Sequence, residues 1–568
     1  MTRLERFSLA AVFAFSLGGR AFAQEPSPTP PPPALPAEVE TRPVPVPTPD
    51  PRPVLELSLQ DAVARALEGN ADIAVEKLNP EIDAQTVRQL QGFYDPLLFS
   101  TITKNSRTTA ATDVFAGGET VDTDSLTYNF GATQELPTGG ALRLDFNNSK
   151  VDTNSTRANF NPTFNSSLFL QLQQPVLRGF KVDNARYQIQ VAKRNRDISD
   201  VQFKQTVVNI SANVKALYYD LIFAIDNLAA QRKSLALAAR LVEENNIKVR
   251  VGTMAPLDVV AAESEQASRE EGVILAENAL LEAEDALKQS IFPKNDPDTW
   301  NMRIVTTERP TAEAFTVDIP AAIAHALAAR TDLTAARLAL ENAEYGLKYS
   351  RAQKLPQLDV LASYGSSGVG GTQLIRDVND PLGPPIGTLP GGSALGDVFS
   401  REFPTWTIGF NVSYPLFNRT ASAVAAKARL QRDQSLAQLT RAELQVAADV
   451  RSAGRAVETN FKRVDSTGAA RVLAERRLDA EQKKFAAGLS TNFLVTQAQR
   501  DLALAEVSEL RAVADYRKSL VNFERVQLAG GSSLNFASNV VSIGANTSNN
   551  ATTGPTGPVT TGTGNPNP

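Results

Sequence analysis

The chain has 568 residues, a formal net charge of −5, one histidine and no cysteine. The lack of cysteine excludes disulfide bonds, thiolate metal sites and a lipid-acceptor thiol, and the slightly acidic balance is unlike the basic footprint of a nucleic-acid-binding protein. Because histidine is the commonest general base and metal ligand, a single histidine in a helical pattern, His325, argues against an enzyme and against a bound cofactor. A catalytic site built from carboxylates alone stays open.

Both ends of the chain differ in composition from the rest. Residues 1–23 have a basic start, a short apolar core and Ala21-Phe22-Ala23 before Gln24, which predicts a cleaved signal peptide. Residues 24–56 form a proline-rich linker, and residues 530–568 form a low-complexity tail that we expect to be disordered. No run of 18 apolar residues follows, so strands would have to cross any membrane.

The region between the tails contains a diverged duplication. The stretch LQDAVARALEGNADI, which begins at Leu59, aligns with a similar stretch that begins at Ile319, and in the same register Pro96 meets Pro356. Further along, Gly252 meets Gly488. We therefore predict two copies of one unit, over residues 57–292 and 315–527.

Each copy is expected to have the same order of elements. The first has a helical segment over 58–92, strands over 97–174, a very long helix over 183–250 and a last helix over 256–291. The second has the corresponding segments over 317–352, 357–414, 421–486 and 492–527. Four prolines stand where a helix meets the strands or the strands return to a helix, namely Pro96, Pro175, Pro356 and Pro415. Proline disfavours both a helix interior and a central strand position, which suits such junctions.

The strands are predicted from the alternation of apolar and polar residues, as in Leu126–Phe130 (LTYNF) and Trp406–Tyr414 (WTIGFNVSY). The motif PTGG at Pro137–Gly140 is typical of an additional hairpin turn, which leaves four or six strands per chain open. Aromatic residues gather near the last strand and are candidates for a membrane-interface girdle or an ordinary strand face: Phe403, Trp406, Phe410, Tyr414 and Phe417.

The lengths of the segments indicate an oligomer. A helix of about 68 residues spans about 100 Å at 1.5 Å per residue, and it must bury its apolar stripe on neighbouring helices. Four to six strands cannot close a membrane barrel by themselves, and an open sheet edge is not tolerated in lipid. Several copies of the chain would therefore have to pool their strands.

The chain resembles the TolC family of outer-membrane efflux proteins in the order of its motifs, which are LxxAVxxALxxNxD, YDPLL, QQPVLRG, VGTMAPLDVVAAESEQ and KKFAAGLSTNFLVTQAQRDL. The resemblance implies a mixed α and β fold and a homotrimer. Four strands per chain would form a twelve-stranded transmembrane β-barrel, continued by a long periplasmic α-helical barrel. It also implies a passive duct in the outer membrane of a Gram-negative-type bacterium, conducting substrates of an efflux or type I secretion system from a periplasmic adaptor and an inner-membrane pump.

Site residues follow from the same resemblance. The two glycine turns would be the periplasmic tips that contact the adaptor, through Val251, Gly252, Thr253, Gly488, Leu489 and Ser490. Asp258 would lie at the periplasmic entrance, although it equally suits the first turn of a helix. This chain departs from the family at Ser490, Leu494 and Gln497, where some members have charged residues, so a salt bridge from Asp258 to Ser490 is impossible.

Two other classes compete with the duct. One is a non-conducting structural or adhesive coiled-coil protein that spans the periplasm, and the other is an enzyme with a carboxylate pair in its loops. The duplicated strand segments between matched prolines argue against the first. No isolated carboxylate pair supports the second.

Overall fold

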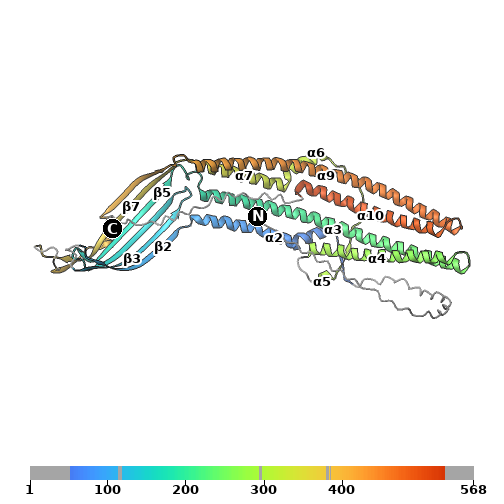
Figure 1. Ribbon diagram of the computed structural model, residues 1–568, viewed down its shortest axis with the longest axis horizontal. Coiled ribbons are helices and arrows are strands. Elements are labelled where there is room, and N and C mark those ends of the chain that lie inside the picture. The colour runs from blue at the N-terminus through green and yellow to red at the C-terminus, as the bar shows by residue number, and fades with distance from the viewer. Residues whose placement is uncertain (1–51, 113–117, 293–296, 379–382, 384, 531–568) are drawn as a thin grey trace, which may run out of the picture. The chain divides into compact units, whose positions relative to one another are not determined.

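The computed structural model describes residues 52–112, 118–292, 297–378, 383 and 385–530. The predicted signal peptide, most of the proline-rich linker and nearly all of the tail lie outside these residues. Within Arg52–Gly530 the elements form long helices and one large sheet, with the strands side by side and the helices running on from them (Figure 1).

The first half of the described chain contains four helices that match the predicted segments and four long strands. They are β1 (Val54–Leu57), α1 (Leu59–Gly69), α2 (Ala71–Gln91), a short 3-10 turn (Gly92–Tyr94), β2 (Leu97–Ala110), β3 (Thr120–Glu135), β4 (Ala141–Thr153), β5 (Phe160–Pro175), α3 (Asn184–Arg250) and α4 (Pro256–Ile291).

The second half repeats this order with fewer long strands. Its elements are α5 (Pro297–Trp300), β6 (Arg303–Thr306), α6 (Ile319–Ala329), α7 (Thr331–Ala352), β7 (Gln357–Ile375), β8 (Gly387–Pro390), α8 (Ala394–Ser400), β9 (Pro404–Ser413), α9 (Arg419–Ala486) and α10 (Asn492–Leu528).

The helices and the linker differ in detail from the sequence-based expectation. The first helical segment of each half is broken, at Asn70 in the first and at Arg330 in the second. The side-chain oxygen of Asn70 accepts hydrogen bonds from the amides of Asp72 and Ile73 and so starts a new helix. The expected linker also ends earlier than residue 56, because β1 pairs in parallel with β6 and Leu57 is fully buried. A segment that pairs and buries a side chain is part of the folded unit.

The helical part has two equivalent cores, one in each half. In the first, Ala62 and Ala66 of α1 pack on Val214 and Leu221 of α3. In the second, Ala322 and Ala326 of α6 pack on Val446 and Val450 of α9, together with further residues of α10. The small alanine side chains let the short helices approach the long ones closely, which buries apolar surface that a single rod would leave exposed. Among the described residues, no helix combines the length and hydropathy needed to cross a lipid bilayer.

The large sheet joins strands from both halves. Its order is β2-β3-β4-β5-β7-β8, with β9 paired to β7 beside β8, and all of these pairs are antiparallel. The central pair, β5 with β7, connects the two halves, from Pro175 opposite Asp359 to Phe160 opposite Gln373. The helix α8 packs on this pair, where Gly368 and Gly370 leave room for its backbone.

Candidate functional site

The four junction prolines lie at the strand ends nearest the helices. Pro96 and Pro356 directly precede β2 and β7, Pro175 is the last residue of β5, and Pro415 follows β9 by two residues. In these places the missing amide removes no hydrogen bond from the middle of the sheet.

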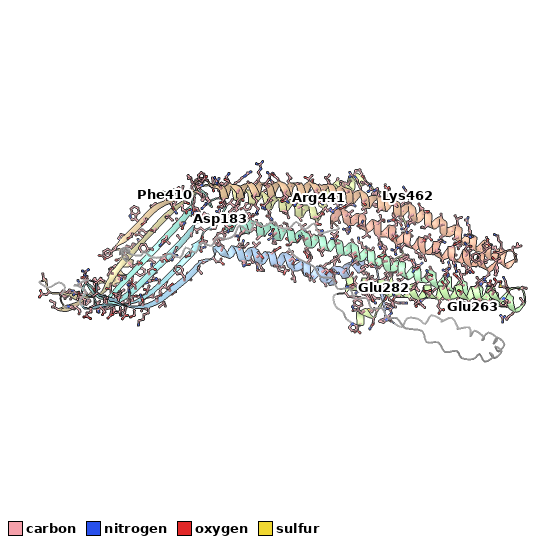
Figure 2. The ribbon with its side chains drawn as sticks, viewed as in Figure 1. Asp183, Glu263, Glu282, Phe410, Arg441 and Lys462 are labelled. Atoms are coloured by element: carbon pink, nitrogen blue, oxygen red, sulfur yellow. The ribbon has the colours of Figure 1, made fainter. Side chains whose placement is uncertain are left out.

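The return from β5 to α3 is fixed by a polar cap. The Asp183 carboxylate accepts a hydrogen bond from the Arg186 amide at 2.6 Å and pairs with the Arg186 guanidinium at 2.9 Å. The same guanidinium donates to the carbonyl of Gly179 at 2.7 Å. Figure 2 shows Asp183 at the transition from strands to helices, and Glu263 toward the other end of the helices.

The two sheet faces differ in chemistry in the part of each long strand nearer the helices, whereas farther along β2, β3 and β4 the face that is apolar there carries charged residues such as Lys104, Asp124 and Lys150. One face carries a continuous row of apolar cross-strand neighbours, for example Phe130 opposite Phe146, Leu144 opposite Leu170 and Ala362 opposite Ile408. Exposed residues on this face are Leu98, Ile102, Phe130, Leu144, Leu170, Tyr364, Trp406, Ile408, Phe410 and Val412. All five residues of the predicted aromatic girdle are exposed. By the alternation of side chains along the strand, Trp406, Phe410 and Tyr414 fall on this apolar face.

The opposite face is polar and hydrogen-bonded. On it Arg143 pairs with Asp145 at 2.8 Å, and Gln171 donates to the same carboxylate. Nearer the helices, Gln357 donates to Asp359 at 2.7 Å. A sheet with one apolar and one polar face is suited to separate lipid from water.

The two predicted tips have the same backbone structure. Gly252 and Gly488 have φ values of +77° and +76°, and nothing lies within 4 Å of the position that a Cβ atom would take. In each tip the amide of the residue after the glycine bonds back across the last turn, from Thr253 to the Lys248 carbonyl at 2.9 Å and from Leu489 to the Lys484 carbonyl at 2.8 Å. These are Schellman caps, so glycine is required by the backbone angle and not by space.

The predicted tip residues are accessible to a partner. Val251 is 67% exposed and Leu489 is 80% exposed. Ser490 donates a hydrogen bond to Glu481 at 2.7 Å, which gives this departure from the family pattern a partner within its own hairpin. Asp258 lies in the first turn of α4, where a carboxylate interacts favourably with the helix dipole.

Two buried amides, which the sequence reasoning missed, hold the tips together. Asn245 is fully buried and donates from Nδ2 to the side-chain oxygen of Asn492 at 3.0 Å. Asn492 in turn donates to the backbone carbonyl of Asp258 at 3.0 Å. Around them the two hairpins share an apolar cluster that includes Leu241, Phe485 and Val495. Asparagine in a long helix gave no signal, because its partner is 247 positions away.

An ion triad centred on a buried carboxylate joins α4 to α10 farther from the tips. The Glu265 side chain is 4% exposed, and its carboxylate pairs with Arg269 at 2.7 Å and accepts a hydrogen bond from Arg500 Nε at 2.9 Å. Burial by itself raises the pKa of Glu265, but the hydrogen bonds from Arg500 and Arg269 outweigh it and hold the pKa below its ordinary value. The triad therefore keeps a charged carboxylate between two helices of different halves.

The histidine and the acidic residues were the candidates for a metal site. His325 is an exposed residue of α6. The described residues contain no group of three or more histidine, aspartate or glutamate side chains arranged to hold a metal ion.

Comparison with known proteins agrees with this architecture. The family model described as "Outer membrane efflux protein" matches residues 141–291 and 322–527. The outer membrane protein TolC of Vibrio cholerae is 22% identical over 338 residues, which is 59% of this chain and 72% of that protein.

Solved structures show the same fold. The CmeC outer membrane channel of Campylobacter jejuni superposes with a TM-score of 0.58 at 16% identity, over 83% of this chain and 85% of that one. The outer membrane protein VceC of Vibrio cholerae has a TM-score of 0.58 at 15% identity, over 84% and 97%. Because the family model covers more than half of the chain, the protein belongs to the outer membrane efflux protein family and is an outer-membrane efflux channel whose helical part lies in the periplasm.

Proposed function

We propose that three copies of the chain assemble into one passive exit duct of a tripartite efflux or type I secretion system. The observation that carries this is the two-faced sheet. One chain presents apolar side chains on one face and polar ones on the other, but leaves the edges β2 and β9 unpaired in the sheet order of the described residues. An unpaired edge is costly in lipid, and pairing between copies removes it.

The helical tips are proposed to dock on a periplasmic adaptor, which in turn contacts an inner-membrane pump. Val251 to Thr253 and Gly488 to Ser490 present exposed apolar side chains on two rigid, matching turns. Asp258 is proposed to lie at the periplasmic entrance and the four prolines at one level of the duct, where the sheet meets the helices. The pump would supply the energy, since a passive duct only conducts.

The assembly can be tested with the full chain. We expect size-exclusion chromatography of detergent-extracted protein to give a trimer, and planar lipid bilayers to show discrete conductance steps when the trimer is inserted. A monomer would refute the shared sheet. A trimer that conducts under no condition, including disruption of the tip contacts, would favour the non-conducting structural protein instead.

The adaptor contact needs a separate test in cells. A photo-crosslinking amino acid placed at Leu489 is expected to capture the cognate adaptor. The same probe at Leu430, which is 68% exposed but lies near the sheet end of α9, serves as the control. Equal capture at both positions would argue against docking at the tips.

A further inference from the structure

The sheet contains more long strands than the family resemblance implies. Strands β2, β3, β4, β5, β7 and β9 have 14, 16, 13, 16, 19 and 10 residues. About 9–11 residues suffice for a tilted strand to cross a membrane. One chain therefore supplies six strands of sufficient length, where the resemblance implies four.

The two additional strands are β3 and β4. Of the six long strands, β2 follows α2, β5 leads to α3, β7 follows α7 and β9 leads to α9, so four strands connect directly to a helix. β3 and β4 connect to each other at the helix-side end, through the turn at Leu136–Gly140. The family match begins at Ala141 in this half, so α2, β2 and β3 lie outside it, whereas in the second half it begins within α6.

The turn between these strands is built into the junction with the helices. Thr138 donates from its hydroxyl to the Gln174 side chain at 2.7 Å, and Gln174 donates back to the Thr138 carbonyl at 3.1 Å. Gly139 has a φ of +81°, and a Cβ atom there would lie 2.6 Å from the Gly179 carbonyl oxygen. The hairpin is thus anchored to the same segment that begins α3, and does not hang free of the sheet.

The additional strands also continue both faces of the sheet. Phe130, Leu144 and Phe146 place apolar side chains on the face that runs on through β5 to β9. The alternate positions are polar, as in Arg143 and its neighbours on the other face. A hairpin with this pattern has the same requirement for lipid on one side and water on the other as its neighbours do.

We propose that the membrane wall of the assembled duct has eighteen strands, with β2 of one copy paired to β9 of the next. This rests on the proposed trimer, since six long strands from each of three copies make eighteen. An even number of antiparallel strands makes the two edges run in opposite directions, so they continue the antiparallel pattern at each seam. Because barrel diameter grows roughly in proportion to strand number, the wall would be about 1.5 times as wide as one of twelve strands.

Engineered disulfides between copies can test the seam, because the chain has no cysteine of its own. Thr101→Cys on β2 would be combined in turn with Thr405→Cys, Thr407→Cys, Gly409→Cys and Asn411→Cys on β9. All of these positions lie on the polar face. A disulfide requires Cα atoms within about 7 Å, which neighbouring strands meet and more distant strands do not. The matched control is Asn147→Cys on β4, combined with the same four positions.

With eighteen strands, at least one Thr101→Cys combination should give covalent trimers on a denaturing gel, and no Asn147→Cys combination should. Covalent trimers from Asn147→Cys instead would show that β4 is the edge and would overturn the proposal while leaving the trimer intact. A trimer on size exclusion that forms neither cross-link would also overturn it. A monomer on size exclusion would mark failure of the proposed assembly itself.

Discussion

Substitution of Arg500 by methionine should loosen the contact between α4 and α10. It removes the guanidinium that bonds the Glu265 carboxylate at 2.9 Å and leaves that buried group with Arg269 alone. A hydrogen bond to a charged group contributes about 1.5–3 kcal/mol. Because the Arg500 side chain is 57% exposed, solvent screening reduces this to about 1–2 kcal/mol.

Hydrogen exchange of the purified protein measures this change locally. The α10 peptide that contains Ala498 and Leu502, both buried, should exchange about 5 to 30 times faster in Arg500→Met, since 1.4 kcal/mol corresponds to a factor of ten. The matched control is Arg477→Met, which removes a 2.7 Å ion pair with Asp501 whose side chains are 51% and 38% exposed. Exposed pairs contribute about 0.2–1 kcal/mol, so the control should change exchange less than about fivefold. An effect of Arg500→Met no larger than that of the control would refute the reasoning.

Three further predictions concern pH, the tips and the sheet. Because the pKa of Glu265 is lowered in the folded protein, its contribution to stability is present above the ordinary pKa of a glutamate and is lost as the pH falls through the lowered value. Hydrogen exchange of α10, corrected for intrinsic rates, should therefore accelerate only in that acidic range. Acceleration near neutral pH would contradict this. Gly252→Ala should lower local stability by about 1–2 kcal/mol, because position 252 has a positive φ, and should speed hydrogen exchange at the tip. Gly409→Ala, at a position with open space but no positive φ, should have little effect on exchange of its own strand. Equal effects of the two variants would contradict this. Ile408→Arg on the apolar face should lower the stability of the lipid-embedded protein by about 2–4 kcal/mol in refolding titrations, whereas Thr407→Arg on the polar face should be tolerated. The reverse order would show that the faces are assigned wrongly.

Much of the fold was predictable because its signals are local. The 3.6-residue and two-residue periodicities predicted the long helices and most strands, and the prolines and glycines predicted where they end. The break at Asn70 was missed because a helical pattern continues across it. The length of the linker was overestimated because β1 pairs with β6, nearly 250 residues away in the chain, and no local pattern of residues indicates such a pairing.

The sequence by itself determined the duplicated order of elements, the resemblance to an efflux family and the two glycine turns, since each depends on residues close together in the chain. Only the tertiary structure decided that β5 pairs with β7, that Asn245 bonds Asn492 and that Glu265 bonds Arg500, the last two across 247 and 235 positions. It also resolved the open choice between four and six strands, because the turn at Leu136–Gly140 packs into the junction beside Gly179. Such contacts depend on how whole elements pack, and packing is a property of the assembled chain.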